Sequence, residues 1–361
     1  MPNASWIDVH TREAVRQVVH GCGNDAYVAC MSQTPAFLDP ARPDVPNIVV
    51  PRGVTPFYLP DRPVRGRLVR LGPLADALLT RHDNLPVVTA LSGQALALAA
   101  ALATALKFHG SFSLQAKGDG PVHMLLADCT EDGALRGYAR ARPDELATLL
   151  AANPNPSAAD LLGNGYLAFT VDQGADREQH QGIVAIEGET LADMALHYFA
   201  TSEQMACSVR LACAPVHFAG ETRWRAAALI LERVSGEGGN DVMLDREEQD
   251  DAWTTATALA RTVKDSELLD DDLPSDRLLY RLFGQEGVVA DRPRALAYGC
   301  RCSRARLSSI LEGFPADDLD HMATEGAPGS NGGGAIVMTC EFCNLDFQFG
   351  REEVHGLERG A

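Results

Sequence analysis

The chain has 361 residues, more than one average domain needs, and its 46% hydrophobic and 22% charged residues are typical of globular proteins and exclude a disordered chain. Its formal net charge of -18 would repel a phosphate backbone, so nucleic acid is not expected as a partner. No export signal opens the chain and its longest apolar run, residues 95–106, is too short to span a bilayer, so we expect a cytoplasmic protein without a membrane partner.

The first 55 residues form the first predicted segment. Prolines crowd its second half and continue to Pro56. Each proline removes an amide donor and fixes one backbone angle, which opposes regular structure. Residues 1–55 are therefore predicted to be a loosely attached N-terminal extension.

Residues 56–240 are predicted to form a core domain of mixed strands and helices. Helical spacing or alanine and leucine content predicts helices over residues 73–83, 92–108 and 190–202. Alternating apolar residues broken by glycines predict strands over residues 63–72, 111–141, 165–188 and 224–234. Because strands and helices do not alternate strictly, the predicted fold class is α+β rather than a doubly wound sheet.

Residues 241–290 are predicted to be an acidic helical linker. Twelve acidic and three basic residues lie between Asp241 and Asp276. Trp253, Ala256 and Ala260 recur at helical spacing, followed by Val263. This stripe is narrow and rich in alanine, so it can bury little area, and we expect a weakly docked helix. A second helix and a turn are expected over residues 278–290.

Four cysteines distinguish the last segment, residues 291–361. They form two close pairs separated by 37 residues: Cys300 with Cys302, and Cys340 with Cys343. Two close pairs of thiolates suit tetrahedral zinc, and their spacing does not match the common iron–sulfur patterns. The sequence predicts a small C-terminal domain holding one Zn²⁺ ion, and most sites of this kind only stabilise their domain.

Two features favour a reactive zinc site over a purely structural one. Arg301, Arg304 and Arg306 surround the first pair and favour thiolate, and each pair is close enough in sequence to form a local disulfide. Zinc binding in a small domain supplies much of its folding free energy. Oxidation would therefore release zinc and unfold about the last sixty residues.

Other functions have weaker support. A constitutive zinc ribbon could bind a partner or nucleic acid through the basic residues 301–306, although the net charge opposes this. Cys340 and Cys343 could form the active site of a thiol oxidoreductase, but the βαβ context is missing. No metalloprotease or hydrolase motif occurs, so an enzyme is not expected. No role is assigned to the five remaining cysteines, and KGDG and LLGNGY are interpreted as turns.

Long stretches of the chain resemble a known family. They include PVRGRLVRL, LKFHGSFSLQAKGDGPV, LLGNGYLAFTVDQG, QGIVAIEGETLADMALHYFATSEQ, YGCRCSRARLSSIL and VMTCEFCNLDFQF. Together they cover most of residues 60–350, and the two cysteine pairs are their most specific element. In these stretches the sequence resembles heat shock protein 33, a bacterial redox-regulated holdase chaperone.

The resemblance implies a chaperone that binds unfolding client proteins without enzymatic turnover. It implies that Cys300, Cys302, Cys340 and Cys343 bind zinc in a reduced, inactive state. It further implies disulfides between Cys300 and Cys302 and between Cys340 and Cys343 in an active, commonly dimeric state, with residues 241–290 as the linker that unfolds. The glycine-rich stretch at residues 325–335 lengthens the family pattern, and residues 1–55 have no recognised counterpart.

Overall fold

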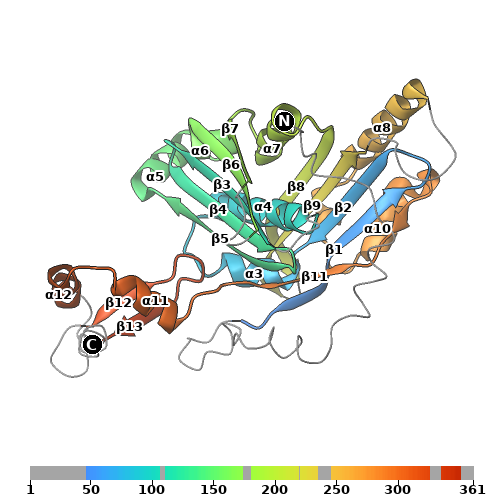
Figure 1. Ribbon diagram of the computed structural model, residues 1–361. Helices are drawn as coiled ribbons and strands as arrows, with labels where there is room; N and C mark the ends of the chain where they lie inside the picture. The colour runs from blue at the N-terminus through green and yellow to red at the C-terminus, as the bar shows by residue number, and fades with distance from the viewer. Residues whose placement is uncertain are drawn as a thin grey trace, which may run out of the picture. The chain divides into compact units, whose positions relative to one another are not determined.

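The computed structural model describes residues 46–105, 110–173, 180–218, 220–234, 245–325 and 335–350. Residues 1–45 of the predicted extension, with Cys22 and Cys30, lie outside this range, as does nearly all of the glycine-rich stretch. The chain divides into two compact units, of which one contains Ile48–Gly299 and the other begins its C-terminal part at Cys300 (Figure 1).

The larger unit is built on one sheet of eleven strands. Ten strands follow the order β7-β6-β3-β4-β5-β11-β1-β2-β9-β8, and β10 pairs with β1. All strand pairs are antiparallel except β5 with β11. The strands are β1 (Val49–Leu59), β2 (Val64–Arg70), β3 (Ser111–Gly118), β4 (Val122–Thr130), β5 (Ala134–Ala141), β6 (Gly165–Asp172), β7 (His180–Ala185), β8 (Cys207–Phe218), β9 (Glu221–Arg233), β10 (Val289–Ala290) and β11 (Arg294–Tyr298).

A buried helix, α4 (Pro86–Ala103), forms the centre of the larger unit (Figure 1). It packs against β3, β4 and β5 in one half of the sheet and against β2, β8 and β9 in the other. The helix begins six residues before the predicted start because Pro86 occupies its first turn, where a missing N–H costs nothing. It is long and apolar enough to cross a membrane by length and composition, but 78% of its apolar window is buried inside the protein.

Shorter helices cover the edges of this core. Two of them begin with a capping box, in which Ser157 and Asp160 cap α6 while Thr190 and Asp193 cap α7. The helices are α3 (Pro73–Leu79), α5 (Pro143–Ala152), α6 (Ala158–Leu162) and α7 (Leu191–Thr201). The mixture of helices with a mainly antiparallel sheet confirms the predicted α+β class.

The acidic linker segment lies on the other face of β2 and β9. It contains α8 (Arg246–Arg261), α9 (Asp265–Leu268), α10 (Ser275–Phe283) and the 3₁₀ turn η3 (Gly284–Glu286). Its apolar residues form a second core with the sheet, in which Phe283 stacks on Phe57 with ring centroids 5.4 Å apart. Ala256, Ala260 and Val263 of the predicted stripe are buried in this core, and Trp253 is half-buried against it.

The N-terminal prediction needs a correction for residues 49–55. This stretch belongs to β1, an interior strand of the sheet, and is not a loose extension. Pro51 falls within the irregular register between Val50 and Val54, where no regular ladder bond is required of it. Pro56, the next proline, still uses its carbonyl to accept the N–H of Asp291 at 2.8 Å.

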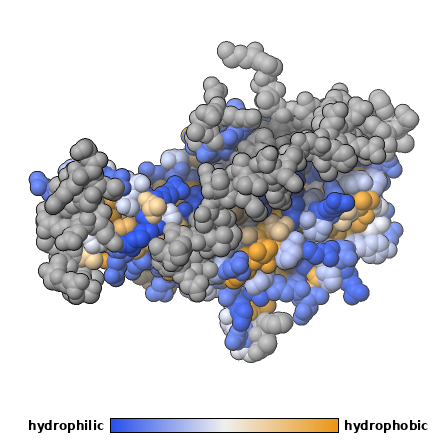
Figure 2. All heavy atoms as spheres, turned by 60° about the horizontal axis from the view of Figure 1, so that its bottom comes forward, coloured by the Kyte–Doolittle hydropathy of each residue, from blue (hydrophilic) through white to orange (hydrophobic). Residues whose placement is uncertain are grey.

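Exposed apolar side chains are scattered over the described residues. The largest exposures include Tyr280 at 70%, Ile183 at 56% and Val49 at 52%. On the face in Figure 2 the described residues are mostly hydrophilic, with apolar ones in small separate groups. Such single residues are ordinary for a folded chain and mark no binding surface by themselves.

Gly66 leaves room for the ring of Phe57, which stacks on Phe283 of the linker. A Cβ atom at this position would lie 2.2 Å from Cζ of Phe57. We expect Gly66→Ala to lower the free energy of unfolding by about 1–3 kcal/mol, because the ring must move away from Phe283. Urea unfolding checks this, with Gly66→Ala/Phe57→Leu as the control that should recover part of the loss. Equal stability of wild type and Gly66→Ala would contradict the packing described here.

Candidate metal centre

The second unit places the four cysteines on two short irregular segments. Cys300 and Cys302 precede α11 (Arg304–Leu311), whose first turn is capped by the Ser303 hydroxyl accepting the N–H of Arg306. Cys340 and Cys343 lie in the turn between β12 (Ile336–Thr339) and β13 (Asp346–Phe349), which pair antiparallel. A further helix, α12 (Ala316–Glu325), completes the described part of this unit.

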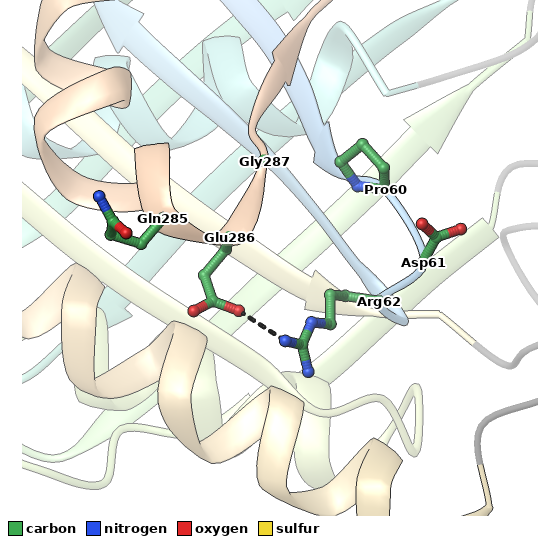
Figure 3. Close-up of a pocket in the computed structure, with 6 residues that line it drawn as sticks. All are labelled: Pro60, Asp61, Arg62, Gln285, Glu286 and Gly287. Carbon is green, nitrogen blue, oxygen red and sulfur yellow. Dashed lines mark ion pairs between the residues drawn. The ribbon is translucent and has the colours of Figure 1, made fainter.

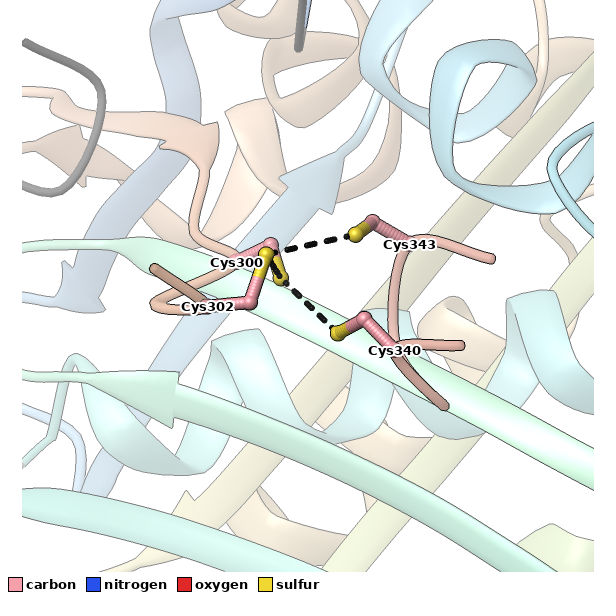
Figure 4. A group of neighbouring side chains, drawn as sticks. All are labelled: Cys300, Cys302, Cys340 and Cys343. Carbon is pink, nitrogen blue, oxygen red and sulfur yellow. Dashed lines mark hydrogen bonds between the residues drawn. The ribbon is translucent and has the colours of Figure 1, made fainter. Parts of the chain in front are cut away.

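The turn at residues 340–345 holds the second cysteine pair in position. The N–H of Cys340 donates to the carbonyl of Leu345 at 2.9 Å, and the N–H of Asn344 donates to the carbonyl of Cys340 at 2.7 Å. Asn344 has a φ of 51°, a left-handed conformation that asparagine tolerates better than most residues. The backbone thus turns tightly around the two thiols and points them toward the first pair (Figure 4).

The four sulfur atoms lie within 4.8 Å of one another. Sγ of Cys300 is 3.3 Å from that of Cys302 and 3.6 Å from that of Cys340, while Sγ of Cys302 is 3.5 Å from that of Cys343. These separations are too long for a disulfide of about 2.05 Å. They approach the edge of about 3.8 Å that a tetrahedron of sulfurs has around an ion 2.3 Å from each. The set fits one metal ion.

The sulfurs strongly influence one another's protonation. Hydrogen bonds with the other three cysteines lower the pKa of Cys340 and raise the pKa of Cys343. In both cases the hydrogen bond with Cys300 has the largest effect. Mutual hydrogen bonding of the sulfurs is therefore the largest influence on the pKa values of these two thiols. Four thiolates this close repel one another, so a bound cation is needed before all of them can lose their protons.

All four cysteines are buried, in a unit with little apolar core. Its other buried apolar side chains among the described residues are Leu311, Leu319, Ile336, Phe347 and Phe349. The guanidinium of Arg304 covers the ring of Phe349, 4.6 Å from its centroid. So few contacts supply little stability, which makes the four sulfurs and any ion they hold the main organising feature of this unit.

The remaining described cysteines lie in the larger unit, away from this cluster. Cys129 is buried on β4, and Cys207 and Cys213 are half-buried on β8. Burial raises the pKa of both Cys207 and Cys213 to about 12. Their burial and raised pKa values make Cys207 and Cys213 poor nucleophiles in the folded protein.

The raised pKa values predict slow alkylation of Cys207 and Cys213. At pH 7.5 only roughly one molecule in 30,000 would carry the reactive thiolate at either position. We expect iodoacetamide to modify both far more slowly in the native protein than in urea, with modification speeding up as pH rises. Peptide mass spectrometry over time gives the rates. Native rates equal to those in urea would show that the thiols are not protected.

The glycine-rich turns interlock and leave no phosphate site. The N–H of Gly120 donates to the carbonyl of Leu162, and the Asp119 carboxylate accepts the N–H of Asn164 at 2.7 Å. A Cβ at Gly118 would lie 2.0 Å from the Leu162 carbonyl oxygen, so glycine is needed for this close approach. The backbone donors of these turns bond within the protein, as the turn interpretation predicts.

A shallow polar depression lies where the β1–β2 turn meets η3 (Figure 3). It is lined by Pro60, Asp61, Arg62, Gln285, Glu286 and Gly287. Arg62 and Glu286 form an ion pair across it at 3.2 Å. The depression contains no nucleophile paired with a base, so it offers no catalytic centre.

Comparisons with known proteins agree with this geometry. Residues 53–350 match the family model described as Hsp33 protein. A 33 kDa chaperonin of Caulobacter vibrioides is 40% identical, covering 81% of this chain and 92% of the relative, and one of Pseudomonas fluorescens is 33% identical, covering 84% and 93%. The crystal structure of the Thermotoga maritima 33 kDa chaperonin matches with a TM-score of 0.64 at 21% identity, covering 85% of this chain and 97% of that one.

Proposed function

The chain belongs to the Hsp33 family of chaperones, and from this premise we propose that it is a redox-regulated holdase whose switch is a zinc ion bound by Cys300, Cys302, Cys340 and Cys343. One observation carries the proposal. Four buried sulfurs from two distant segments lie at the spacing of a tetrahedral site, without being bonded to one another. Zinc is the preferred metal because Zn²⁺ is commonly bound by four cysteine thiolates in a tetrahedron and does not itself change oxidation state.

The switch would follow from thiol oxidation. Cys300 with Cys302 and Cys340 with Cys343 are the proposed disulfide pairs. Each disulfide removes two electrons and two protons from a pair of thiols and reduces one hydrogen peroxide to two waters. Two disulfides consume all four ligands, so the zinc-binding energy that folds the second unit is lost.

Each segment of the chain has its own proposed role. Residues 49–240 carry the proposed client-binding core, residues 241–290 the metastable linker and residues 300–361 the switch. β11, which the sequence assigned to a switch domain of residues 291–361, belongs to the sheet of the core. The residues before β1 are an extension of unassigned role. The linker covers apolar sheet residues, among them Leu68 and Leu229, that would become accessible on its release. Unfolding proteins in the cytoplasm are the proposed clients. The active form is proposed to be a homodimer.

Zinc content and chaperone activity, measured on the same samples, test the proposal. We expect the reduced protein to contain one zinc ion per chain and to suppress client aggregation poorly. After peroxide or hypochlorous acid, we expect zinc release, the loss of four thiols and strong suppression of aggregation without ATP. Full activity in the zinc-bound reduced protein would refute the switch, and oxidant-independent, salt-sensitive RNA binding would favour a zinc ribbon instead.

A further inference from the structure

Helix α11 of the second unit carries an exposed apolar stripe (Figure 1). Ile310 is 46% exposed and Phe314 is 41% exposed, while Leu307 is half-buried. The N–H of Phe314 donates to the carbonyl of Leu311 at 3.0 Å, so the helical turn continues past the end of α11. Residues spaced at i, i+3 and i+7 share one side of a helix. We call Leu307, Ile310 and Phe314 the α11 stripe.

The α11 stripe belongs to the unit that has the least apolar core. The second unit buries few apolar side chains besides its cysteines, yet it leaves two large ones exposed on one helix. α11 begins two residues after Cys302, so a partner that covers the stripe would also hold the segment that carries the first cysteine pair. Cover at this place would therefore affect how readily the metal centre opens.

The N-terminal extension contains the sequence signals of an amphipathic helix. Ser5 followed by Asp8 matches the capping-box pattern that begins a helix, and Gly21 is typical of a helix end. Between these signals, the apolar residues that recur at helical spacing are Ala14, Val15, Val18 and Val19. The sequence thus predicts a helix over residues 6–20 with one apolar side.

Charges around the two apolar surfaces are complementary. Arg12 and Arg16 are four residues apart and lie at one border of the apolar side of the predicted helix. The exposed carboxylates that accompany the α11 stripe in the sequence are Glu312, Asp317 and Asp318. Opposite charges at the rim favour one orientation of the predicted helix on this surface.

The extension joins the sheet at the strand that leads into the second unit. The N–H of Tyr298 donates to the carbonyl of Ile48 at 3.0 Å, and Val49 lies opposite Ala297. Cys300 follows Tyr298 by two residues. Only residues 21–47 separate the predicted helix from this point, so the chain itself keeps the helix near the second unit at a high effective concentration.

We propose that the predicted helix at residues 6–20 packs on the α11 stripe and stabilises the folded, metal-binding second unit. A segment that binds only the folded form of a unit makes its opening rarer. The extension therefore slows zinc release and raises the oxidant dose that the switch requires. The inference rests on the proposed function for this regulatory consequence, and the segment lies outside residues 53–350, the part that matches the family model.

Amide hydrogen exchange and zinc release are compared in the reduced full-length protein and in a chain that lacks residues 2–45. We expect residues 304–314 to exchange at least about fivefold faster in the shortened chain, because the stripe loses its cover. A chromogenic zinc chelator should show zinc release by hydrogen peroxide to be faster by a similar factor. Equal exchange of residues 304–314 in the two chains would overturn the inference.

Point variants locate the contact on the two apolar surfaces. Val18→Asp in the full-length chain should reproduce the effect of the deletion, whereas Val28→Asp, the same change elsewhere in the extension, should not. Ile310→Asp should likewise speed exchange and zinc release, and Ile183→Asp, at an exposed isoleucine of the larger unit, should not.

Combining the changes separates contact from simple damage. If residues 6–20 cover Ile310, Ile310→Asp has little further effect in the chain that lacks residues 2–45, because the contact is already gone. An equal effect of Ile310→Asp in both chains would overturn the inference. So would exchange in the shortened chain that slows as protein concentration rises, since it would assign the stripe to a second copy of the chain.

The two readouts separate this inference from the proposed function. If the oxidised protein suppresses aggregation while exchange and zinc release ignore the extension, the inference fails and the holdase function stands. If the extension protects residues 304–314 but the reduced, zinc-bound protein is already fully active, the proposed switch fails and the docking of the extension stands.

Discussion

Cys343→Ser is expected to abolish zinc binding and to make the chaperone active without oxidant. Cys343 is 0% exposed and supplies one of the four clustered sulfurs, and a serine hydroxyl is a poor zinc ligand. In small domains the free energy of zinc binding, about 10–16 kcal/mol at neutral pH, contributes directly to folding, and the second unit has few other stabilising contacts. Loss of even part of this free energy should unfold residues 300–350.

Three measurements check this expectation. The variant should contain less than one tenth of the zinc of wild type, lose the slow amide exchange of β12 and β13, and suppress aggregation while reduced. Cys129→Ser, a buried cysteine outside the cluster, is the control and should keep its zinc. A Cys343→Ser protein that holds a full equivalent of zinc would show that the four sulfurs are not a single site.

Phe283→Ala is expected to detach the linker with the zinc still bound. Phe283 is 0% exposed and stacks on Phe57, and truncation of a buried phenylalanine costs about 3–5 kcal/mol. α8 contributes mainly alanines to this core, and the leucines of α9 and α10 cannot fill the space that the ring would leave. We expect partial chaperone activity in the reduced state and faster proteolysis within residues 245–283.

The matched control lies on the same helix. Tyr280→Ala removes an aromatic side chain that is 70% exposed, so it should change the free energy of unfolding by less than about 0.5 kcal/mol. Limited proteolysis and zinc content are compared for both variants. If Phe283→Ala were as resistant to protease as wild type, the second core could not be what holds the linker in place.

Local sequence patterns predicted much of the larger unit. Alternation located β2 and the β6–β7 hairpin, and the capping residues Thr190 and Asp193 account for the start of α7 close to its predicted position. The patterns were weaker where tertiary contacts decide the structure. The sequence did not predict α5 or β8. It also did not predict the first part of β1, because this stretch is rich in proline and its pairing depends on strands distant in the sequence.

The metal centre was predictable in its residue types but not in its surroundings. Two cysteine pairs at short spacing indicated four ligands, and the structure brings all four sulfurs together. The left-handed Asn344 directly after Cys343 and the cover of Phe349 by Arg304 were missed. An asparagine directly after a Cys-x-x-Cys turn is the signal that could have predicted the left-handed conformation of Asn344. The contact of Arg304 with Phe349 could not have been predicted, because it joins segments distant in the sequence.

The position of β11 has a consequence for how the protein is made. This strand inserts between β5 and β1 and joins the two halves of the sheet, although it ends only two residues before Cys300 in the sequence. During synthesis, the sheet therefore stays open along its middle until Tyr298 has left the ribosome. A truncated product ending at residue 240 would keep that gap as two unpaired strand edges, which are prone to aggregation.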